Sequence, residues 1–420
     1  MVRIARRHLL QAGAAAAVTA TLPRWVGTAR AGTPPKNLIL VLQTGGWDTT
    51  YTLDPKPGVA GIDAPSGTVQ SFANIPVLTD PSRPNVTAFF QRYGASTAVI
   101  NGIQVRSFIH PDCTKRVLTG TPSDQNPDLG AIAAWEHAKD LPVPYLVLGS
   151  SALSGPLAPI VGRAGMTNQI STLLSPGAAY ADPGGTTPSP GFVPSDNEEA
   201  LVKGFLDASA ERMRATRGQR GSNAAQIDAF EKSLDRAGLL KAFAQKSGGF
   251  GKQAYTPDLS VQVSVGTAAL QAGLSYAVMM ETTGWDTHAN DPLQGPLADS
   301  LYKGLLALGE QLETLGMLDN TVVFVLSEMG RTPKLNGAGG KDHWPVTSAL
   351  VFGAGVAGGR VFGATDNLLG AQSLDFTSGA VDPNGKQLQT GNLVAGVLAL
   401  VGVDASSYLP GVEAFHALAA

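Results

Sequence analysis

Short runs of apolar residues, each bounded by glycine, proline or polar residues, recur along the chain. The first run, residues 37–42 (NLILVL), lies between a pair of prolines and a pair of glycines. Continuous apolar runs of this length are typical of strands that are buried on both faces of a parallel sheet. Five further runs share this pattern and are predicted strands: residues 98–100, 145–148, 276–280, 321–326 and 348–352.

One segment has the spacing of an amphipathic helix. Leucines recur every three or four residues between positions 297 and 315, and the pattern ends near Gly316. This helix stands between the apolar runs 276–280 and 321–326, and such a strand, helix and strand form the crossover that joins parallel strands. The pattern therefore predicts an α/β fold in which a mostly parallel sheet is sandwiched by helices.

The middle of the chain lacks these strand signals. Residues 150–194 are rich in Gly, Pro, Ser and Thr and predict a long loop, whereas residues 197–246 carry a charged helical pattern. The helical segment is either a hairpin packed on the domain or a mobile lid over a site. We interpret residues 32–420 as a single domain with an insertion at about 150–265. Candidate apolar contacts of the helical segment are Leu201, Phe205, Met213, Phe230, Leu234 and Leu239.

Residues 1–31 have the features of an export signal. Arg6 and Arg7 precede an Ala-rich apolar run, and an Ala-Arg-Ala step at 29–31 suits a signal peptidase. The apolar run is shorter than the roughly 20 residues that span a bilayer, so we expect no stable membrane anchor. The prediction is a twin-arginine signal peptide, export through the twin-arginine translocase, and a periplasmic or secreted mature protein.

Composition excludes several other classes of protein. The chain is 43% hydrophobic, which is enough to bury a core and argues against disorder. Its 30 basic and 33 acidic side chains nearly balance, so the chain lacks the excess positive charge that nucleic-acid binding requires. Removal of residues 1–31 would take away five arginines and leave 25 basic and 33 acidic side chains, a net charge of −8. The one cysteine, Cys113, has no partner for an internal disulfide in an oxidising compartment. We expect it to pack as a small apolar residue and expect stability to come from the core or a bound metal.

Four segments that follow predicted strands carry acidic residues and histidines. Asp48 ends the Gly-Gly-Trp-Asp segment after the first strand, and Asp286 and His288 follow the run 276–280. Glu328 comes directly after the run 321–326, and His343 lies in a Gly-rich loop beyond it. The carboxyl ends of the strands are where open α/β sheets bind ligands, so we expect these side chains to gather at one edge.

Histidine positions favour a metal site. The sequence has six histidines, of which His8 leaves with the signal, His416 lies in the terminal tail and His137 is expected on a helix surface. The remaining three, His110, His288 and His343, all lie in loops after apparent strands. Imidazoles and carboxylates in such loops suit zinc or another borderline divalent metal.

The motifs GGWD, GWDTHAND and SEMGRTPKLNGAGGKDHWP, behind a twin-arginine leader, resemble the bacterial domain-of-unknown-function family 1501. That family is similar to the alkaline phosphatase and sulfatase superfamily, whose members hold divalent metal at the carboxyl ends of a mostly parallel sheet. The resemblance implies one metal subsite formed by Asp286, His288 and His343. It implies a second subsite that keeps Asp48 and Glu328 but has Met329 in place of an imidazole.

The position of the nucleophile departs most from the superfamily pattern. Sulfatases carry Cys-x-Pro-Ser-Arg ten residues before the Gly of Leu-Thr-Gly, and here that position is His110. Cys113 lacks the following proline, which argues against its conversion to formylglycine. The candidate nucleophiles are therefore His110, a hydroxyl of Ser107 or Thr114, or a metal-bound water; His110 is alternatively a further ligand.

These observations lead to three hypotheses about function. The first is an exported, metal-dependent hydrolase of phosphate or sulfate esters, with a small-molecule or glycan ester as substrate and zinc, or else manganese, calcium or magnesium, as cofactor. Under this hypothesis, Lys341 or Arg331 neutralises the charge that develops on the transferred phosphate or sulfate group. The second is a metal-stabilised, non-catalytic binding or envelope protein on the same fold. In the third, the acids and imidazoles are structural and bind no ion.

Overall fold

The computed structural model describes residues 36–164, 196–218, 223–246 and 259–420. Contacts group residues 35–420 into one compact unit. The predicted signal peptide, residues 1–31, and most of the predicted loop at 165–194 lie outside the described residues.

A large sheet forms the centre of the described part of the chain. Its eight strands lie in the order β12-β4-β11-β8-β1-β7-β5-β6. Strand β11 is antiparallel to both of its neighbours, and all the other adjacent pairs are parallel, which confirms the predicted mostly parallel sheet. The strands are β1 (Asn37–Gln43), β4 (Thr97–Gln104), β5 (Tyr145–Val147), β6 (Val161–Arg163), β7 (Ala277–Thr282), β8 (Thr321–Ser327), β11 (Val346–Gly353) and β12 (Arg360–Phe362).

Strand β1 shows why these apolar runs form a buried sheet. Leu38, Leu40 and Leu42 pack into the core on one side of the sheet, and Ile39 and Val41 pack into the core on the other side. Alternate residues of a strand point to opposite faces, so a continuous apolar run fills both cores at once. Each of these side chains is fully buried, which stabilises the fold by about 1.5–3 kcal/mol per side chain.

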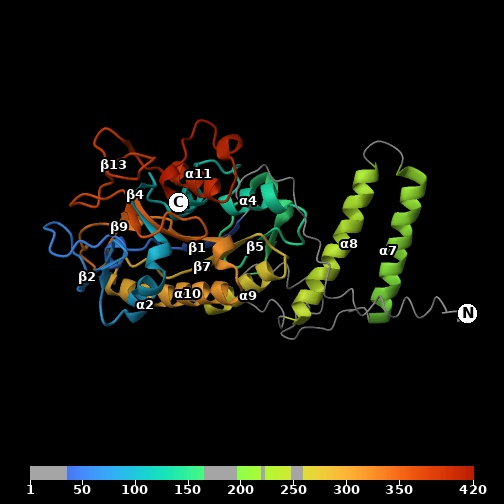
Figure 1. Cartoon of the computed structure of the whole chain (residues 1–420), viewed down its shortest axis with the longest axis horizontal. Helices are drawn as coiled ribbons and strands as arrows, with labels where there is room; N and C mark the ends of the chain where they lie inside the picture. Colours follow the sequence, from blue (N-terminus) through green and yellow to red (C-terminus); the bar gives the residue numbers. More distant parts are fainter. Residues whose placement is uncertain (1–35, 165–195, 219–222, 247–258) are drawn as a thin grey trace, which may run out of the picture. The chain divides into compact units, whose positions relative to one another are not determined.

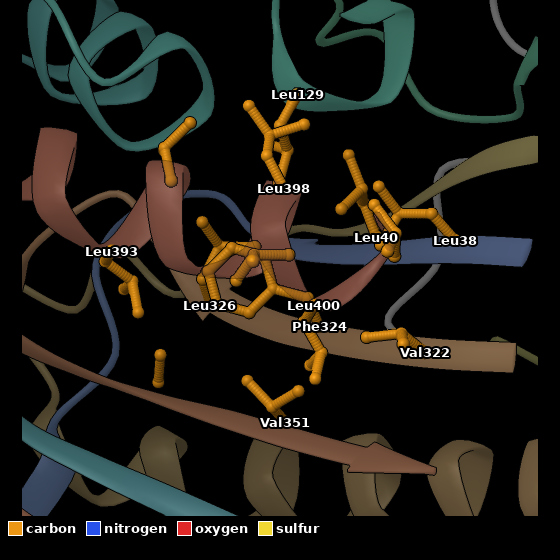
Figure 2. Packing of buried hydrophobic residues seen from close by; sticks show 14 of the residues in the cluster. Leu38, Leu40, Leu129, Val322, Phe324, Leu326, Val351, Leu393, Leu398 and Leu400 are labelled. Atoms are coloured by element: carbon orange, nitrogen blue, oxygen red, sulfur yellow. The ribbon is translucent and has the colours of Figure 1, made fainter. Parts of the chain in front are cut away.

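Helices cover both faces of the sheet. In Figure 1, α4 and α11 lie on one side of β1 and β7, and α2, α9 and α10 lie on the other side. Figure 2 shows the first of these cores, where Leu393, Leu398 and Leu400 of α11 pack against leucines of β1 and against β8 and β11. The helices on this side are α3 (His110–Thr119), α4 (Leu129–Ala138) and α11 (Thr390–Leu400), and those on the other side are α2 (Pro84–Tyr93), α9 (Ser260–Gln271) and α10 (Gln294–Thr314).

The leucine pattern that predicted a crossover helix is confirmed by α10. Leu301, Leu305, Leu308 and Leu312 are buried against the sheet. The chain leaves the helix through Gly316, whose positive φ of 64° suits the left-handed residue that often follows a helix.

The segment predicted to be helical contains two helices, α7 (Asp196–Arg217) and α8 (Asn223–Lys246), which contact each other. The predicted apolar contacts at Leu201, Phe205 and Leu239 are wrong, because these side chains are exposed to 73%, 65% and 49%. The contacts between the helices include charged groups, since Arg214 pairs with acidic residues of α8. No helix in the described part of the chain is both long and apolar enough to cross a membrane.

His137 also differs from its predicted surface position. Its ring is half-buried against Tyr276, and its Nε2 donates to the carbonyl oxygen of Val401 at 3.0 Å. Burial lowers the pKa of this imidazole, so it is a neutral packing residue of α4.

Several short elements complete the fold. Three two-stranded sheets pair β2 (Thr68–Phe72) with β3 (Ile75–Thr79), β9 (Gly330–Arg331) with β10 (His343–Trp344), and β13 (Ser373–Leu374) with β14 (Lys386–Gln387). The 3-10 helices are Thr49–Tyr51, Gly94–Ser96, Gly155–Ile160, Asp291–Leu293, Leu318–Asn320, Ala405–Ser407 and His416–Leu418.

Candidate metal centre

Three of the four predicted segments leave the sheet side by side. Strand β1 pairs in parallel with both β7 and β8, and in this register Gln43 lies opposite Thr282 on one side and Ser327 on the other. The chain beyond these three strand ends carries Asp48, Asp286 and Glu328. Parallel pairing therefore brings these acidic residues to the same edge of the sheet.

Two glycines allow the loops at this edge to pack backbone against backbone. Gly45 has a φ of +118°, and a Cβ on it would lie 2.4 Å from the backbone nitrogen of Asp286. A Cβ on Gly340 would lie 2.2 Å from the carbonyl carbon of His288. Contacts this close exclude any side chain at these positions, so the loops of Asp48, His288 and Lys341 are held tightly together.

The fourth segment reaches the same place through a short antiparallel ladder. Strands β9 and β10 pair so that His343 lies opposite Arg331. The ladder folds the glycine-rich loop back onto the end of β8. His343 thereby comes within reach of Asp286, 57 residues earlier in the chain.

Three imidazoles converge on the carboxylate of Asp286. Nε2 of His288 lies 3.1 Å from Oδ1 of Asp286, and Nε2 of His343 lies 3.4 Å from the same oxygen. The two Nε2 atoms are 2.8 Å apart. Nε2 of His110 approaches the other oxygen, Oδ2, at 3.5 Å. Donor atoms of His110, Asp286 and His343 lie within 4.8 Å of one another, a spacing that allows them to share one ion.

The opposite nitrogen of each ring is bound to an acceptor. Nδ1 of His110 lies 2.6 Å from Oε1 of Glu328, Nδ1 of His288 lies 3.0 Å from Oδ1 of Asp342, and Nδ1 of His343 lies 2.6 Å from the carbonyl oxygen of Phe108. An acceptor at Nδ1 favours the tautomer that carries the proton there and leaves the lone pair on Nε2. Metal-binding histidines in proteins are held by this kind of contact.

Asp286 is kept ionised by its surroundings. Partial burial alone would raise the pKa of this carboxyl, but a hydrogen bond from Arg331 at 2.6 Å, the charge of Arg331, and the nearby His110 and His288 outweigh that effect and lower it. The Arg331 side chain is fully buried, and its guanidinium also donates to the carbonyl oxygens of Gly46 and Lys341. Arg331 thus holds Asp286 and the surrounding loops instead of facing solvent.

Glu328 orients other groups of the centre. It is 2% exposed, and its Oε1 accepts from the backbone nitrogen of Gly45 at 2.7 Å and contacts His110. Its Oε2 accepts a hydrogen bond from the hydroxyl of Thr114. Both carboxylate oxygens therefore have protein partners, and the structure places Glu328 behind His110 instead of beside the other two histidines.

Asp48 has a different partner from the one that the resemblance implies. Its Oδ2 lies 2.5 Å from Nζ of Lys341, and neither side chain has any exposed surface. Its Oδ1 accepts from the backbone nitrogen and the hydroxyl of Thr50, at 2.9 and 2.6 Å. Asp48 and Lys341 therefore form a closed pair, and the ammonium group does not face the three histidines.

Several contacts of the centre were not foreseen from the sequence. Asp342 and the carbonyl of Phe108 hold two of the histidines, and no sequence pattern singles them out, because the contacts depend on how the loops fold. For Asp342 the only available signal is its place beside His343. Cys113 is buried one turn of α3 beyond His110, and burial raises its pKa to about 11, which keeps it a neutral thiol.

The family of the chain follows from its match to a family model. Residues 35–415 match the model described as "Protein of unknown function (DUF1501)". The chain belongs to this family. No curated protein matches the sequence.

Solved structures similar to this chain include members of the alkaline phosphatase superfamily. The C-terminal periplasmic domain of EcEptC from Escherichia coli is 9% identical, with a TM-score of 0.42 over 91% of this chain and 86% of that one. The lipoteichoic acid synthase LtaP from Listeria monocytogenes is 11% identical, with a TM-score of 0.39 over 91% and 74%. A protein in the alkaline phosphatase superfamily from Vibrio parahaemolyticus is 11% identical, with a TM-score of 0.36 over 91% and 70%. Similarity at this level assigns no activity to the chain.

Proposed function

We propose that this protein is an exported, metal-dependent hydrolase of phosphate or sulfate esters. The observation that carries the proposal is the arrangement of the imidazoles at the sheet edge. Their Nε2 atoms converge on the carboxylate of Asp286, while every Nδ1 is bound to an acceptor. Neutral imidazoles with oriented lone pairs around a carboxylate are what a divalent ion requires of a protein.

The donor set fits zinc, and also suits manganese as an alternative. Asp286, His288 and His343 would hold the ion, because their donor atoms lie 2.8–3.4 Å from one another. Two imidazole nitrogens and one carboxylate oxygen are a frequent ligand set of catalytic zinc. A divalent ion held there would supply a Lewis acid for the ester oxygen of the substrate. Calcium and magnesium prefer all-oxygen sites and fit these donors less well.

His110 is the group that moves a proton. Its Nδ1 proton is directed to Glu328, so its Nε2 is free to accept a proton from water as that water attacks phosphorus or sulfur. A new bond to the water oxygen forms, the ester bond to the alcohol oxygen breaks, and Nε2 returns the proton to the leaving alcohol. Glu328 stabilises the imidazolium that exists between these two transfers.

The position of helix α3 favours an anionic substrate. The helix begins at His110, so the positive end of its dipole lies at the centre. Within its first turn Pro111 has no N–H, the N–H of Cys113 donates to the carbonyl oxygen of Ile109, and Asp112 is acidic, so the contribution of the helix to anion binding would come mainly from its dipole. Arg331 adds a buried positive charge behind Asp286.

The export part of the proposal depends on residues 1–31. The paired arginines, the short apolar run and the Ala-Arg-Ala step support a twin-arginine signal and a periplasmic or secreted location. The substrate would then be a small-molecule or glycan ester outside the cytoplasm.

One observation favours a second function, that of a metal-stabilised binding protein without turnover. Nε2 of His110 is 3.5 Å from Oδ2 of Asp286, so His110 is placed to act as a fourth ligand. Zinc with four protein ligands is typical of structural sites, whereas catalytic zinc keeps one position open. The role of His110 therefore distinguishes the two functions.

Metal analysis of single variants tests the proposal. The proteins would be purified without chelator as the parent, His288→Ala, His343→Ala and His110→Ala, with His416→Ala, an exposed histidine near the C-terminus, as the matched control. We expect a divalent ion in the parent, its loss in the His288 and His343 variants, and its retention in the other two. Hydrolysis across a panel of phosphate and sulfate esters should fall about 10²–10⁴-fold in His110→Ala and stay unchanged in the control.

Two other results would change the conclusion. A parent protein that stays free of metal after incubation with zinc or manganese contradicts the hydrolase and the binding protein alike. Loss of the ion in His110→Ala, together with no ester hydrolysis by the parent, identifies a closed structural site and favours the second function.

A further inference from the structure

A buried amide side chain connects two of the loops that form the histidine centre, the three imidazoles around Asp286. Gln294 is the first residue of α10, and its side chain is fully buried. Its Oε1 accepts from the backbone nitrogen of Asp48 at 2.9 Å. Its Nε2 donates to the carbonyl oxygen of Trp285 at 2.9 Å and to the hydroxyl oxygen of Thr287 at 3.0 Å. One side chain of the helix therefore bonds to the loop after β1 and to the loop after β7.

The partners of the amide fix which way it faces. A backbone N–H only donates and a carbonyl oxygen only accepts, so Oε1 faces Asp48 and Nε2 faces Trp285. The Nε2 group has two hydrogens, and its two shortest contacts use both of them. These contacts are to the residues immediately before and after Asp286 in the chain. Gln294 thus fixes the chain on both sides of a proposed metal ligand.

Arg331 binds the same loops from strand β9. Its Nη2 donates to the carbonyl oxygen of Trp285 at 3.0 Å, and its Nε donates to that of Gly46 at 2.9 Å. Nε2 of Gln294 also lies 3.3 Å from the carbonyl oxygen of Gly46. A carbonyl oxygen has two lone pairs, so that of Trp285 accepts from Arg331 and Gln294 at once. Because Nη2 of Arg331 also lies 2.6 Å from Asp286, the amide and the guanidinium together determine where this carboxylate stands.

The turn before α10 holds Gln294 in place. The backbone nitrogen of Asp291 donates to the carbonyl oxygen of Gly339 at 3.1 Å. The hydroxyl of Tyr51 lies 3.1 Å from both the carbonyl oxygen and Oδ2 of Asp291. Gly339 belongs to the loop that leads to His343, and Tyr51 belongs to the loop after β1. The start of the helix is therefore bonded to its neighbours and presents the amide from a rigid element.

We propose that Gln294 is a positioning residue of the metal centre. Its amide holds the backbone around Asp286 so that the carboxylate meets His288 and His343 in the geometry that binds an ion. Gln294 acts through Trp285 and Thr287 and is not itself a ligand. Without the amide, part of the binding free energy of the ion is used to order this loop, so the affinity falls. The inference rests on the metal centre of the proposed function and does not depend on ester hydrolysis.

Zinc titration of variants at both ends of these contacts tests the inference. Gln294→Met keeps a similar volume and loses every hydrogen bond of the amide. Thr287→Val removes one of the two contacts beside Asp286, and Thr287→Ser keeps the hydroxyl. Gln262→Met is the matched control, because Gln262 of α9 is also buried and bonds through both amide atoms, at 2.7 and 2.9 Å, to the backbone of Glu281 within β7.

We expect Gln294→Met to bind zinc about 10–100-fold more weakly than the parent. Thr287→Val should show a smaller loss, and Thr287→Ser should bind zinc like the parent. Gln262→Met should lose stability and keep the zinc affinity of the parent. Co²⁺ bound in place of zinc gives a second readout, because its visible absorption reports the arrangement of the ligands. The absorption bands should shift in Gln294→Met and not in Gln262→Met, whereas a loss of stability alone shifts neither.

The parent protein reports on the proposed metal centre, and the ratio of variant to parent reports on Gln294. Equal zinc affinities of Gln294→Met and the parent overturn the inference and leave the centre in place. Equal weakening in Gln294→Met and Gln262→Met also overturns it, because the effect then comes from general stability. A parent that binds no zinc contradicts the proposed function and the inference together.

The remaining outcomes separate the inference from the hydrolase. Weaker zinc binding by Gln294→Met, with no ester hydrolysis by the parent, supports the inference and removes only the catalytic part of the proposal. If Gln294→Met does not fold, the Thr287 pair decides. A lower zinc affinity of Thr287→Val than of Thr287→Ser supports the inference, and equal affinities overturn it.

Discussion

The histidine centre and the Asp48–Lys341 pair lie at the same edge of the sheet, yet they are built in opposite ways. The side chains of His288 and Asp286 are 42% and 47% exposed, whereas those of Asp48 and Lys341 have no exposure. In the first region three imidazole nitrogens face a carboxylate whose one charged partner, Arg331, is buried behind it, and in the second each charge meets its opposite. The difference indicates that the histidine centre is arranged to bind an ion from solution. The Asp48–Lys341 pair, in contrast, needs no further ligand.

Removing one member of the closed pair should have the largest effect on stability. Lys341→Met leaves Asp48 buried without its counter-ion, and loss of one partner of a buried pair costs about 3–5 kcal/mol of unfolding free energy. Urea denaturation in metal-free buffer measures this. Adding Asp48→Asn should recover most of the loss. Equal unfolding free energies of the parent and Lys341→Met would show that the Asp48–Lys341 pair does not stabilise the fold.

The pH dependence of stability should reveal Asp291. Burial and the charge of Asp48 raise its folded pKa to about 6, above its ordinary value of 3.8, so the folded state keeps a proton that the unfolded chain has lost between these values. Stability from this group therefore falls as pH rises from about 4 to about 6, by about 2 kcal/mol. Urea unfolding across that range should show a smaller decline in Asp291→Asn than in the parent. Identical slopes would mean that Asp291 is ionised throughout.

A smaller effect, on metal affinity, is expected from Asp342, which contacts the proposed ligand His288 but is not itself a proposed ligand. Asp342 accepts from Nδ1 of His288 at 3.0 Å, and hydrogen bonds from Asn336 and His288 lower its pKa. Asp342→Asn should weaken metal binding about 10–100-fold, because the imidazole loses its anionic acceptor. Calorimetric titration with zinc measures this. Asp63→Asn, which alters a carboxylate bound to Lys334 and Leu335 of the same loop, is the control and should bind zinc like the parent.

Much of the sheet could be predicted, because strands buried on both faces produce continuous apolar runs. The runs that became β1 and β8 are examples, and their pairing explains why Glu328 comes close to Gly45. Short edge strands such as β6 and β12 were not predicted, since three residues give no periodic signal. Burial of α4 against its neighbours likewise depends on tertiary packing, which is why the environment of His137 was wrongly predicted.

Residue types at the centre could be predicted, but their partners could not. Strand ends indicated which acids and histidines would gather at one edge. Whether Asp48 binds a metal or forms an ion pair depends on the position of the Lys341 side chain. That position is set by the packing of Gly340 and by the β9–β10 ladder. Backbone packing of this kind has no signature in composition or hydrophobic period.

The sequence distance between partners also has a consequence for biosynthesis. Asp48 and Lys341 are 293 residues apart, so at about 5–20 residues per second Asp48 waits roughly 15–60 s on the ribosome for its counter-ion. The loops of the histidine centre span a similar stretch, from His110 to His343. A nascent chain that has not yet reached Lys341 and His343 therefore has no complete centre, and the whole site assembles only after these residues have been synthesised.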